Sequence, residues 1–395
     1  MEESLFWKRF RKNKLSVAGI VFIAITVVIS ILGYLITPDS SPYANQQILS
    51  LAARPPMFKV QMLHLRKNQE ESSVSFFQKL INGKEPEFTM MPMNSYILKG
   101  DSIIVREYTG NTTDIFEVKY HIVDVVYPIN PQKKILKDEK GNYSFTDINN
   151  NSRKANISEV KQQLQKNNIK EKRYLLGTDK FGRDLLSRLF IGARVSLSVG
   201  FISVFISLLI GIPFGIFAGY YRGKTDAIIM WIVNVVWSVP TLLMVLSISL
   251  VLGKGFWQVF VAVGLTMWVE VARIVRGQVI GIREKEYIEA AKALGFGDLR
   301  IIFRHILPNV IGPVIIISAA NFSSAILMEA GLSFLGIGVQ PPMPSWGSMI
   351  KDHYGYIILN QAYLAIIPGV AIMLMVLAFN FIGNGLRDAF DTKLN

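Results

Sequence analysis

Two glutamates lie in or beside long apolar stretches of this chain, where an ionised side chain is costly and therefore commonly functional. Glu270 is followed by Arg273 and Arg276, so the sequence predicts that a local ion pair neutralises it. Glu329 has no charged neighbour within one helical turn. We therefore interpret Glu329 as a candidate gate or subunit contact. Neither glutamate stands in a pattern that predicts a reaction.

The residue patterns of enzymes and metal sites are missing from the 395-residue sequence. It contains no cysteine, which excludes disulfides, thiolate zinc sites, iron–sulfur clusters and a cysteine nucleophile. Its histidines are scattered, at positions 64, 121, 305 and 353, so a histidine-built metal site is not expected. Gly223-Lys224-Thr225 looks like the end of a phosphate-binding loop, but Ala218 occupies the position of its first glycine. We therefore expect no catalytic residue, no metal ion and no cofactor on this chain.

Long apolar runs dominate the chain, of which 51% is hydrophobic and 18% charged; the run 256–275 is the one that contains charges, Glu270 and Arg273 toward its end. A helix needs about 20 apolar residues to cross a bilayer. Six runs meet this requirement: residues 15–36, 195–221, 227–252, 256–275, 310–328 and 364–386. The sequence therefore predicts an all-α integral membrane protein with six transmembrane helices, and we expect no binding of nucleic acid despite the net charge of +13.

The distribution of lysine and arginine predicts the orientation of these helices. Sixteen of them fall in the N-terminal segment, the loops after the second and fourth runs and the C-terminal tail, whereas the two short loops on the other side hold two. Short cytoplasmic loops carry the excess of positive charge. We therefore expect both termini in the cytoplasm and a multi-pass protein in the plasma membrane.

A polar segment, residues 37–174, separates the first two runs and is expected outside the cytoplasm. Residues 102–126 alternate in hydrophobicity, which predicts strands. Residues 149–172 are polar and are interpreted as a surface helix or a flexible link. We expect a small α+β domain, with two readings open: a docking surface for an external partner, or a decoration with a packing role.

The loop between the fourth and fifth runs has the most informative composition. It predicts a short helix, a stop at Gly295 in a left-handed conformation, a second helix, and Pro308 opening the next span. Small residues at Ala290 and Ala291 would let another backbone approach closely. Charged neighbours could fix the register of such a contact. From physics alone, docking into a partner and lying on the membrane surface are equally good interpretations.

Glu289-Ala290-Ala291, followed by Gly295 and by His-Ile-Leu-Pro at 305–308, resembles the EAA loop of ABC importer permeases. Stretches 176–200, 272–279 and 329–347 are similar to permeases of the oligopeptide, dipeptide and nickel family. The order of these blocks looks like that of the second permease in oligopeptide or dipeptide systems. The resemblance covers about residues 1–36 and 174–395 and leaves out the inserted segment.

This resemblance implies the type I importer permease fold, with residues 1–36 as the N-terminus and first helix, 37–174 as the insert and 175–395 as a core of five helices. The loop at 283–309 would couple to an ATPase subunit. The implied coupling residues are Glu289, Ala290, Ala291, Lys292, Leu294 and Gly295. The implied partners are a sister permease, two ATP-binding subunits that hold ATP and magnesium, an extracytoplasmic peptide-binding lipoprotein and membrane lipid.

A peptide carries polar backbone groups, so a pathway for it must offer water or polar side chains. The candidates are Asn234, Ser238, Asn321, Ser324, Glu329 and Asn380, with Ser247 and Ser323 as further polar residues of the spans. The competing interpretation for each is a hydrogen bond between helices. Pro213, Pro240 and Pro368 are expected to bend their spans and shape the cavity.

The leading prediction is a permease subunit of an oligopeptide importer, without enzymatic activity of its own. A dipeptide or nickel permease of the same family is the nearest alternative, although no span carries a histidine in its interior. A membrane sensor with an extracytoplasmic ligand domain is an alternative of another class and would need a cytoplasmic output domain. A secondary transporter working alone would leave the EAA-like loop unexplained.

Overall fold

The protein is described from a computed structural model that covers residues 2–70, 73–110, 116–138, 141–253 and 255–390. The chain forms two compact units. The first consists of Met1–Ser30, Gly192–Tyr354 and Ala365–Asn395, and the second of Ile31–Ile191 and Gly355–Leu364. The second unit is wider than the predicted insert, because it includes the ends of two apolar helices and the segment before the last one.

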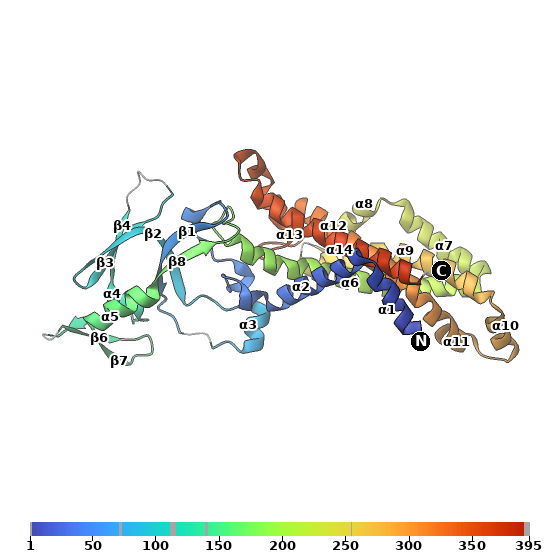
Figure 1. The fold of residues 1–395 in the computed structure, drawn as a ribbon, viewed down its shortest axis with the longest axis horizontal. Helices are drawn as coiled ribbons and strands as arrows, with labels where there is room; N and C mark the ends of the chain where they lie inside the picture. Colours follow the sequence, from blue (N-terminus) through green and yellow to red (C-terminus); the bar gives the residue numbers. More distant parts are fainter. Residues whose placement is uncertain (1, 71–72, 111–115, 139–140, 254, 391–395) are drawn as a thin grey trace. The chain divides into compact units, whose positions relative to one another are not determined.

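Helices make up the first unit (Figure 1). In chain order they are α1 (Glu2–Lys12), α2 (Lys14–Ile36), α6 (Leu185–Tyr221), α7 (Gly223–Ser238), α8 (Thr241–Leu252), α9 (Phe256–Arg283), α10 (Glu286–Ala293), α11 (Asp298–Ile301), α12 (Leu307–Phe334), α13 (Trp346–His353) and α14 (Tyr363–Phe390). A π-helical turn, Ile302–Ile306, joins α11 to α12, and a 3-10 segment, Tyr354–Leu359, follows α13. The end of α2 and the starts of α6 and α14 extend into the second unit.

Five helical stretches in the described ranges are long and apolar enough to cross a membrane, and a sixth is bent. The bent one is the predicted run 227–252, which the structure divides into α7 and α8 at an angle of 90°. Pro240 causes the break, because its ring disfavours the helical conformation at Val239, which is extended (φ −87°, ψ 129°). The prediction of six spans is therefore met only if this bent pair counts as one span.

α9 is the most enclosed of the apolar helices, and it packs closely on α6. Gly211, Gly215 and Gly219 form a glycine stripe along one face of α6, at four-residue spacing. A Cβ on any of them would come too close to a backbone carbonyl oxygen of α9. The distance would be 2.7 Å from Gly211 to Trp268, 2.6 Å from Gly215 to Ala272 and 2.8 Å from Gly219 to Arg276. Small residues at this spacing allow two membrane helices to approach closely.

α2 packs on α14 at the margin of the unit. The Ser16 hydroxyl donates to the Phe381 carbonyl oxygen at 2.6 Å, and a Cβ on Gly19 would lie 2.8 Å from the Ala378 carbonyl oxygen. Only 22% of the apolar window of α2 is buried, against 67% for α9. The first span is therefore peripheral, as the resemblance implied.

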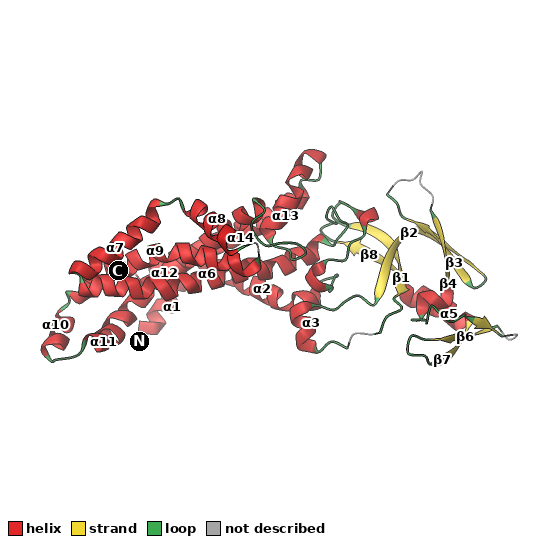
Figure 2. Cartoon of the chain, turned by 180° about the vertical axis from the view of Figure 1, so that it is seen from behind, coloured by secondary structure: helices red, strands yellow, loops and turns green. Residues whose placement is uncertain are grey.

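The second unit combines two antiparallel sheets with short helices (Figure 2). The larger sheet has the order β4-β3-β2-β1-β8, with strands β1 (Phe58–Arg66), β2 (Phe88–Lys99), β3 (Ser102–Glu107), β4 (Glu117–His121) and β8 (Ile169–Tyr174). The smaller has the order β5-β6-β7, with strands β5 (Leu136–Lys137), β6 (Asn142–Thr146) and β7 (Ser152–Asn156). The helices are α3 (Phe76–Asn82), α4 (Ile122–Val126) and α5 (Ile157–Gln163), with a π-helical turn at Leu164–Asn168 and 3-10 turns at Pro42–Ala44 and Leu49–Leu51.

Part of the predicted strand region, residues 102–126, is wrong. β3 and β4 are strands, but Ile122–Val126 is the helix α4, in which Ile122, Val123 and Val125 are all fully buried. Neighbouring residues of a strand face opposite sides, so burial of both Ile122 and Val123 favours a helix turn inside the core. Residues 111–115 of the same region lie outside the described ranges.

Residues 149–172 are neither a single surface helix nor a flexible link. They form β7, α5, the π-helical turn and most of β8. α5 buries Val160, and Leu164 in the following turn is buried beside it in the core under the larger sheet. Asn168 closes this core, since its amide nitrogen donates to the carbonyl oxygens of His64 at 2.7 Å and Val125 at 3.0 Å.

Candidate coupling loop and pathway

The coupling loop consists of α10, α11 and the π-helical turn, at one end of the helical unit (Figure 1). Its underside is apolar: Ile288, Ala291, Ile301, Ile302 and Ile306 are buried against the ends of α6 and α9. Burial of these side chains removes apolar surface from water, which holds the two short helices in place where their own propensity would not. The loop is therefore a packed platform on the helix ends.

Gly295 ends α10 as the sequence predicts. Its φ is +77°, and its N–H donates to the Lys292 carbonyl oxygen at 2.9 Å, while the Phe296 N–H donates to the Ala291 carbonyl oxygen at 3.1 Å. These two bonds are those of a Schellman cap. Glycine suits this position because other residues pay a steric cost in the left-handed region.

The six predicted coupling residues divide by exposure. Five of them are exposed: Glu289, Ala290, Lys292, Leu294 and Gly295. Leu294 is 74% exposed. Ala291 differs, because it is only 5% exposed and packs in the underside of the loop. Ala291 thus supports the platform from within, and the outward face is formed by the other five.

Tyr220 connects the platform to α6, a feature that the sequence analysis missed. Its hydroxyl donates to Asp298 Oδ1 at 2.7 Å, so the last turn of α6 holds the first residue of α11. The Lys292 ammonium lies 5.2 Å from the centre of the Tyr220 ring, and the Arg283 guanidinium 5.9 Å. The two partners are 78 residues apart, so no local pattern could have revealed the bond.

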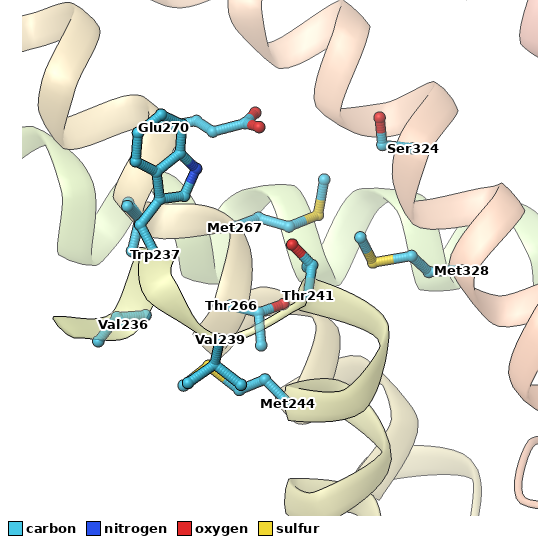
Figure 3. A pocket seen from close by; sticks show the side chains of 11 residues that line it. Val236, Trp237, Val239, Thr241, Met244, Thr266, Met267, Glu270, Ser324 and Met328 are labelled. Carbon is cyan, nitrogen blue, oxygen red and sulfur yellow. The ribbon is translucent and has the colours of Figure 1, made fainter. Parts of the chain in front are cut away.

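A pocket opens at the bend between α7 and α8 (Figure 3). Side chains from three segments surround it: the bend itself, α9 and α12. Its lining comprises Val236, Trp237, Val239, Thr241, Met244, Thr266, Met267, Val269, Glu270, Ser324 and Met328. It combines an apolar wall rich in methionine with hydroxyls and one carboxylate, a composition that suits an adaptable binding surface.

The six predicted pathway residues do not converge on this pocket. Ser324 lines it. Asn234 and Ser238 lie on α7 next to it in the chain, and both are bonded within the protein: Asn234 Oδ1 accepts from Arg273 at 2.6 Å, and the Ser238 hydroxyl donates to the Val235 carbonyl oxygen at 2.7 Å. Asn321 is buried in α12, and Asn380 is exposed on α14.

The predicted ion pair of Glu270 is wrong. Arg276 instead forms a bidentate pair with Asp226 on α7, at 2.5 and 2.6 Å. Arg273 stacks on the Trp237 ring at 3.6 Å and donates to Asn234. Both arginines therefore connect α9 to α7. The carboxylate of Glu270 is exposed and lines the pocket.

Glu329 has a partner close to it in the sequence, but this partner is an uncharged serine. It is fully buried in α12, and the Ser333 hydroxyl, one turn later, donates to its Oε1 at 2.6 Å. Ser333 Oγ also lies 3.4 Å from Ser345 Oγ, the N-cap of α13. The second carboxylate oxygen, Oε2, has no hydrogen-bond partner among the described residues. Glu329 therefore belongs to a polar cluster between α12 and α13.

Two family models match this sequence. Residues 211–395 match the binding-protein-dependent transport system inner membrane component, and residues 4–56 match the N-terminal transmembrane domain of oligopeptide transport permease C.

Individual relatives agree with these models. The chain is 42% identical over 219 residues to a glutathione transport system permease protein, GsiD, of Pectobacterium atrosepticum, covering 55% of this chain and 72% of that protein. It is 44% identical over 218 residues to a dipeptide transport system permease protein, DppC, of Alkalihalophilus pseudofirmus (55% and 71% covered). It is 40% identical over 223 residues to an oligopeptide transport system permease protein, OppC, of Bacillus subtilis (56% and 73% covered).

Among solved structures, a chain of the inward-facing MetNI methionine ABC transporter matches 51% of this chain and 96% of its own length, at 20% identity and a TM-score of 0.44. The sequence matches suffice: the chain belongs to the binding-protein-dependent transport system inner membrane components, the permease subunits of ABC importers. It has their type I permease fold, it is a multi-pass inner membrane protein, and a permease subunit is not itself an enzyme.

Proposed function

We propose that this chain is one of two permease subunits in an importer of short peptides, driven by ATPase subunits that dock on the outward face of α10. ATP and magnesium would bind to those subunits and not to this chain. When the ATPase subunits close on ATP, the docked loops are drawn together, and rigid spans open the cavity to the outside. A peptide released by an extracytoplasmic binding lipoprotein then enters between the two permeases.

The observation that carries the coupling role is the contrast between the two sides of α10. One side is anchored by an apolar core and by Tyr220, and the other exposes Glu289, Ala290 and Leu294 to solvent. An exposed leucine beside small and charged residues is a typical interface core with a polar rim. Because the base is packed, a push on this face is passed to α6 and α9.

Contacts at one end of the helical unit support the proposed orientation. The rings of Phe6 in α1 and Phe390 in α14 lie 4.9 Å apart, and the Phe390 ring is also next to Gly312, in the second turn of α12. These contacts support termini on the same side as the coupling loop, which must face the cytoplasm if ATPase subunits bind it. The mixed α/β unit would then lie outside the cell.

The cargo is inferred from the relatives, whose names concern dipeptides, oligopeptides and glutathione. The pocket supports a peptide, because methionines and Trp237 can accept varied side chains while Thr241, Thr266 and Glu270 offer polar partners. Weak recognition of this kind suits a transporter that must release its cargo. We assign no role to nickel, which none of these relatives' names mentions.

Charge reversal of Glu289 tests the coupling role. Glu289→Arg places a like charge beside Lys292 on the docking face and should abolish copurification of the ATPase subunits and uptake of labelled peptide, with normal membrane insertion. Glu289→Gln is the matched control, since it keeps the shape and loses only the charge, and it should retain assembly. Normal ATPase binding and uptake by Glu289→Arg would contradict the coupling assignment.

A further inference from the structure

α3 (Phe76–Asn82) exposes an apolar surface on the second unit. Phe76 is 61% and Phe77 71% exposed, and Ile81, one turn after Phe77, is 62% exposed. The two phenyl rings are edge to face, with centroids 5.9 Å apart. Lys79 is the one charged residue of the helix. Solitary exposed apolar residues are ordinary, but three gathered on a seven-residue helix mark an interaction surface.

The position of α3 identifies what covers this surface. Its C-terminal cap, Gly83, is buried against the end of the apolar helix α2: a Cβ there would lie 3.0 Å from the Tyr34 ring and 2.6 Å from the Ser40 carbonyl oxygen. The Lys84 N–H donates to the same carbonyl oxygen at 2.9 Å. α3 is therefore fixed beside residues 34–40, at the C-terminal end of the apolar helix α2 (Figure 1).

The end of α2 next to α3 also exposes apolar side chains. Leu35 and Ile36, in the last turn of α2, are also exposed, in a helix that must meet acyl chains. Tyr34 itself is buried against Ala44 and Ile191, so the base of the second unit is packed around the end of the span. A short helix with aromatic residues, a lysine and no acidic residue is typical of the membrane interface.

We propose that α3 is a membrane-interface anchor: Phe76, Phe77 and Ile81 insert among the lipids next to the first span and hold the second unit against the bilayer. The occupant of this surface is lipid, with acyl chains around the rings and headgroup phosphates near Lys79 and Lys84. The proposal requires only that α2 spans the membrane, and it is independent of the cargo and of the coupling loop.

The absence of cysteine allows a direct test. Phe77→Cys gives a single thiol in the full chain, which can carry a nitroxide label in lipid nanodiscs of phosphatidylcholine, with and without phosphatidylglycerol. Ile97→Cys is the matched control, because Ile97 is 64% exposed and lies nine residues along β2 from Phe88. At about 3.3 Å per residue that is about 30 Å from the strand end that follows α3.

A label at position 77 should collide several-fold more with dissolved oxygen, and several-fold less with an aqueous nickel chelate, than a label at position 97. This result in either lipid supports the anchor; a requirement for phosphatidylglycerol would indicate that the lysines contribute. Equal access of the nickel chelate to both positions overturns the proposal, as does shielding of position 77 from both reagents, which would mean that protein covers it. Phe76→Cys provides a second, independent site if the first variant is poorly expressed.

Discussion

Tyr220 and Asp298, 78 residues apart, meet at 2.7 Å and join the last turn of α6 to the first residue of α11. α6 carries the glycine stripe that packs on α9, and α11 is the second helix of the coupling loop. A displacement of the loop therefore reaches α6 through this hydrogen bond to a carboxylate, in addition to the apolar contacts under the loop. Bonds of this charge-assisted kind are stronger than neutral ones.

Removal of the Tyr220 hydroxyl should loosen the loop without unfolding the bundle. In Tyr220→Phe we expect a loss of about 1–3 kcal/mol of local stability, the usual worth of a hydrogen bond to a charged group. Hydrogen exchange of the amides in 286–301 should accelerate, and peptide uptake should fall while the ATPase subunits still bind. Tyr221→Phe is the control, since the neighbouring ring is about half exposed. Equal exchange in both variants would show that the bond does not hold the loop.

Enlarging the two adjacent alanines of α10 should have different consequences. Ala290 is exposed, so Ala290→Leu should leave hydrogen exchange in the loop unchanged and weaken the binding of ATPase subunits. Ala291 is buried, and Ala291→Leu should destabilise the loop by about 1–3 kcal/mol through overpacking. Exchange rates and copurification, measured on both variants, separate the two effects. If the two variants show the same exchange rates and the same copurification, the loop has a different conformation in the assembly.

Gly295, which caps α10, allows a test of backbone strain in the left-handed conformation, and Gly297, two residues later, serves as its control. No atom lies within 4 Å of a Cβ added at Gly295 or at Gly297, but φ is +77° at the first and −67° at the second. Gly295→Ala should therefore destabilise the loop by about 1–2 kcal/mol. Gly297→Ala should cost less, about 0.5 kcal/mol, because Gly297 is the N-cap of α11, where glycine is preferred to alanine. Thermal unfolding and loop exchange measure both, and an equal cost at the two sites would exclude the strain.

Acid should loosen the junction of α3 and β2. Hydrogen bonds from Lys84 and Arg66, the latter at 2.6 Å, lower the pKa of Glu87. A carboxyl whose pKa is lower in the folded state adds stability at pH values above its unfolded pKa, and this stability is lost as the pH falls through the folded value. Between about pH 6 and pH 3, exchange at Lys67 and Lys84, corrected for its intrinsic rate, should rise several-fold. Glu87→Gln should already show fast exchange at pH 6 and little further change.

Several features were predictable because they depend on neighbouring residues alone. An uncharged run of about 20 residues has few stable environments outside a bilayer, so the spans were found without a fold. Pro240 was expected to bend its span, and α7 and α8 meet there at 90°. Pro213 and Pro368 were expected to do the same, but they lie inside the uninterrupted helices α6 and α14. Gly295 ended α10 as expected, since a left-handed residue is a local requirement of the cap. The family resemblance rested on similar local blocks, and it is confirmed.

Other features needed the tertiary structure, because they join residues distant in the chain. The sequence offered Glu270 as the partner of Arg276, but Asp226, 50 residues away, accepts hydrogen bonds from two of its guanidinium nitrogens once α7 lies against α9. It also placed Ala291 beside Ala290 on a docking face, whereas packing on the helix ends turned one inward and one outward. Periodicity gives the relative faces of an element, and only the neighbouring elements decide which face is buried and which partner a charge reaches.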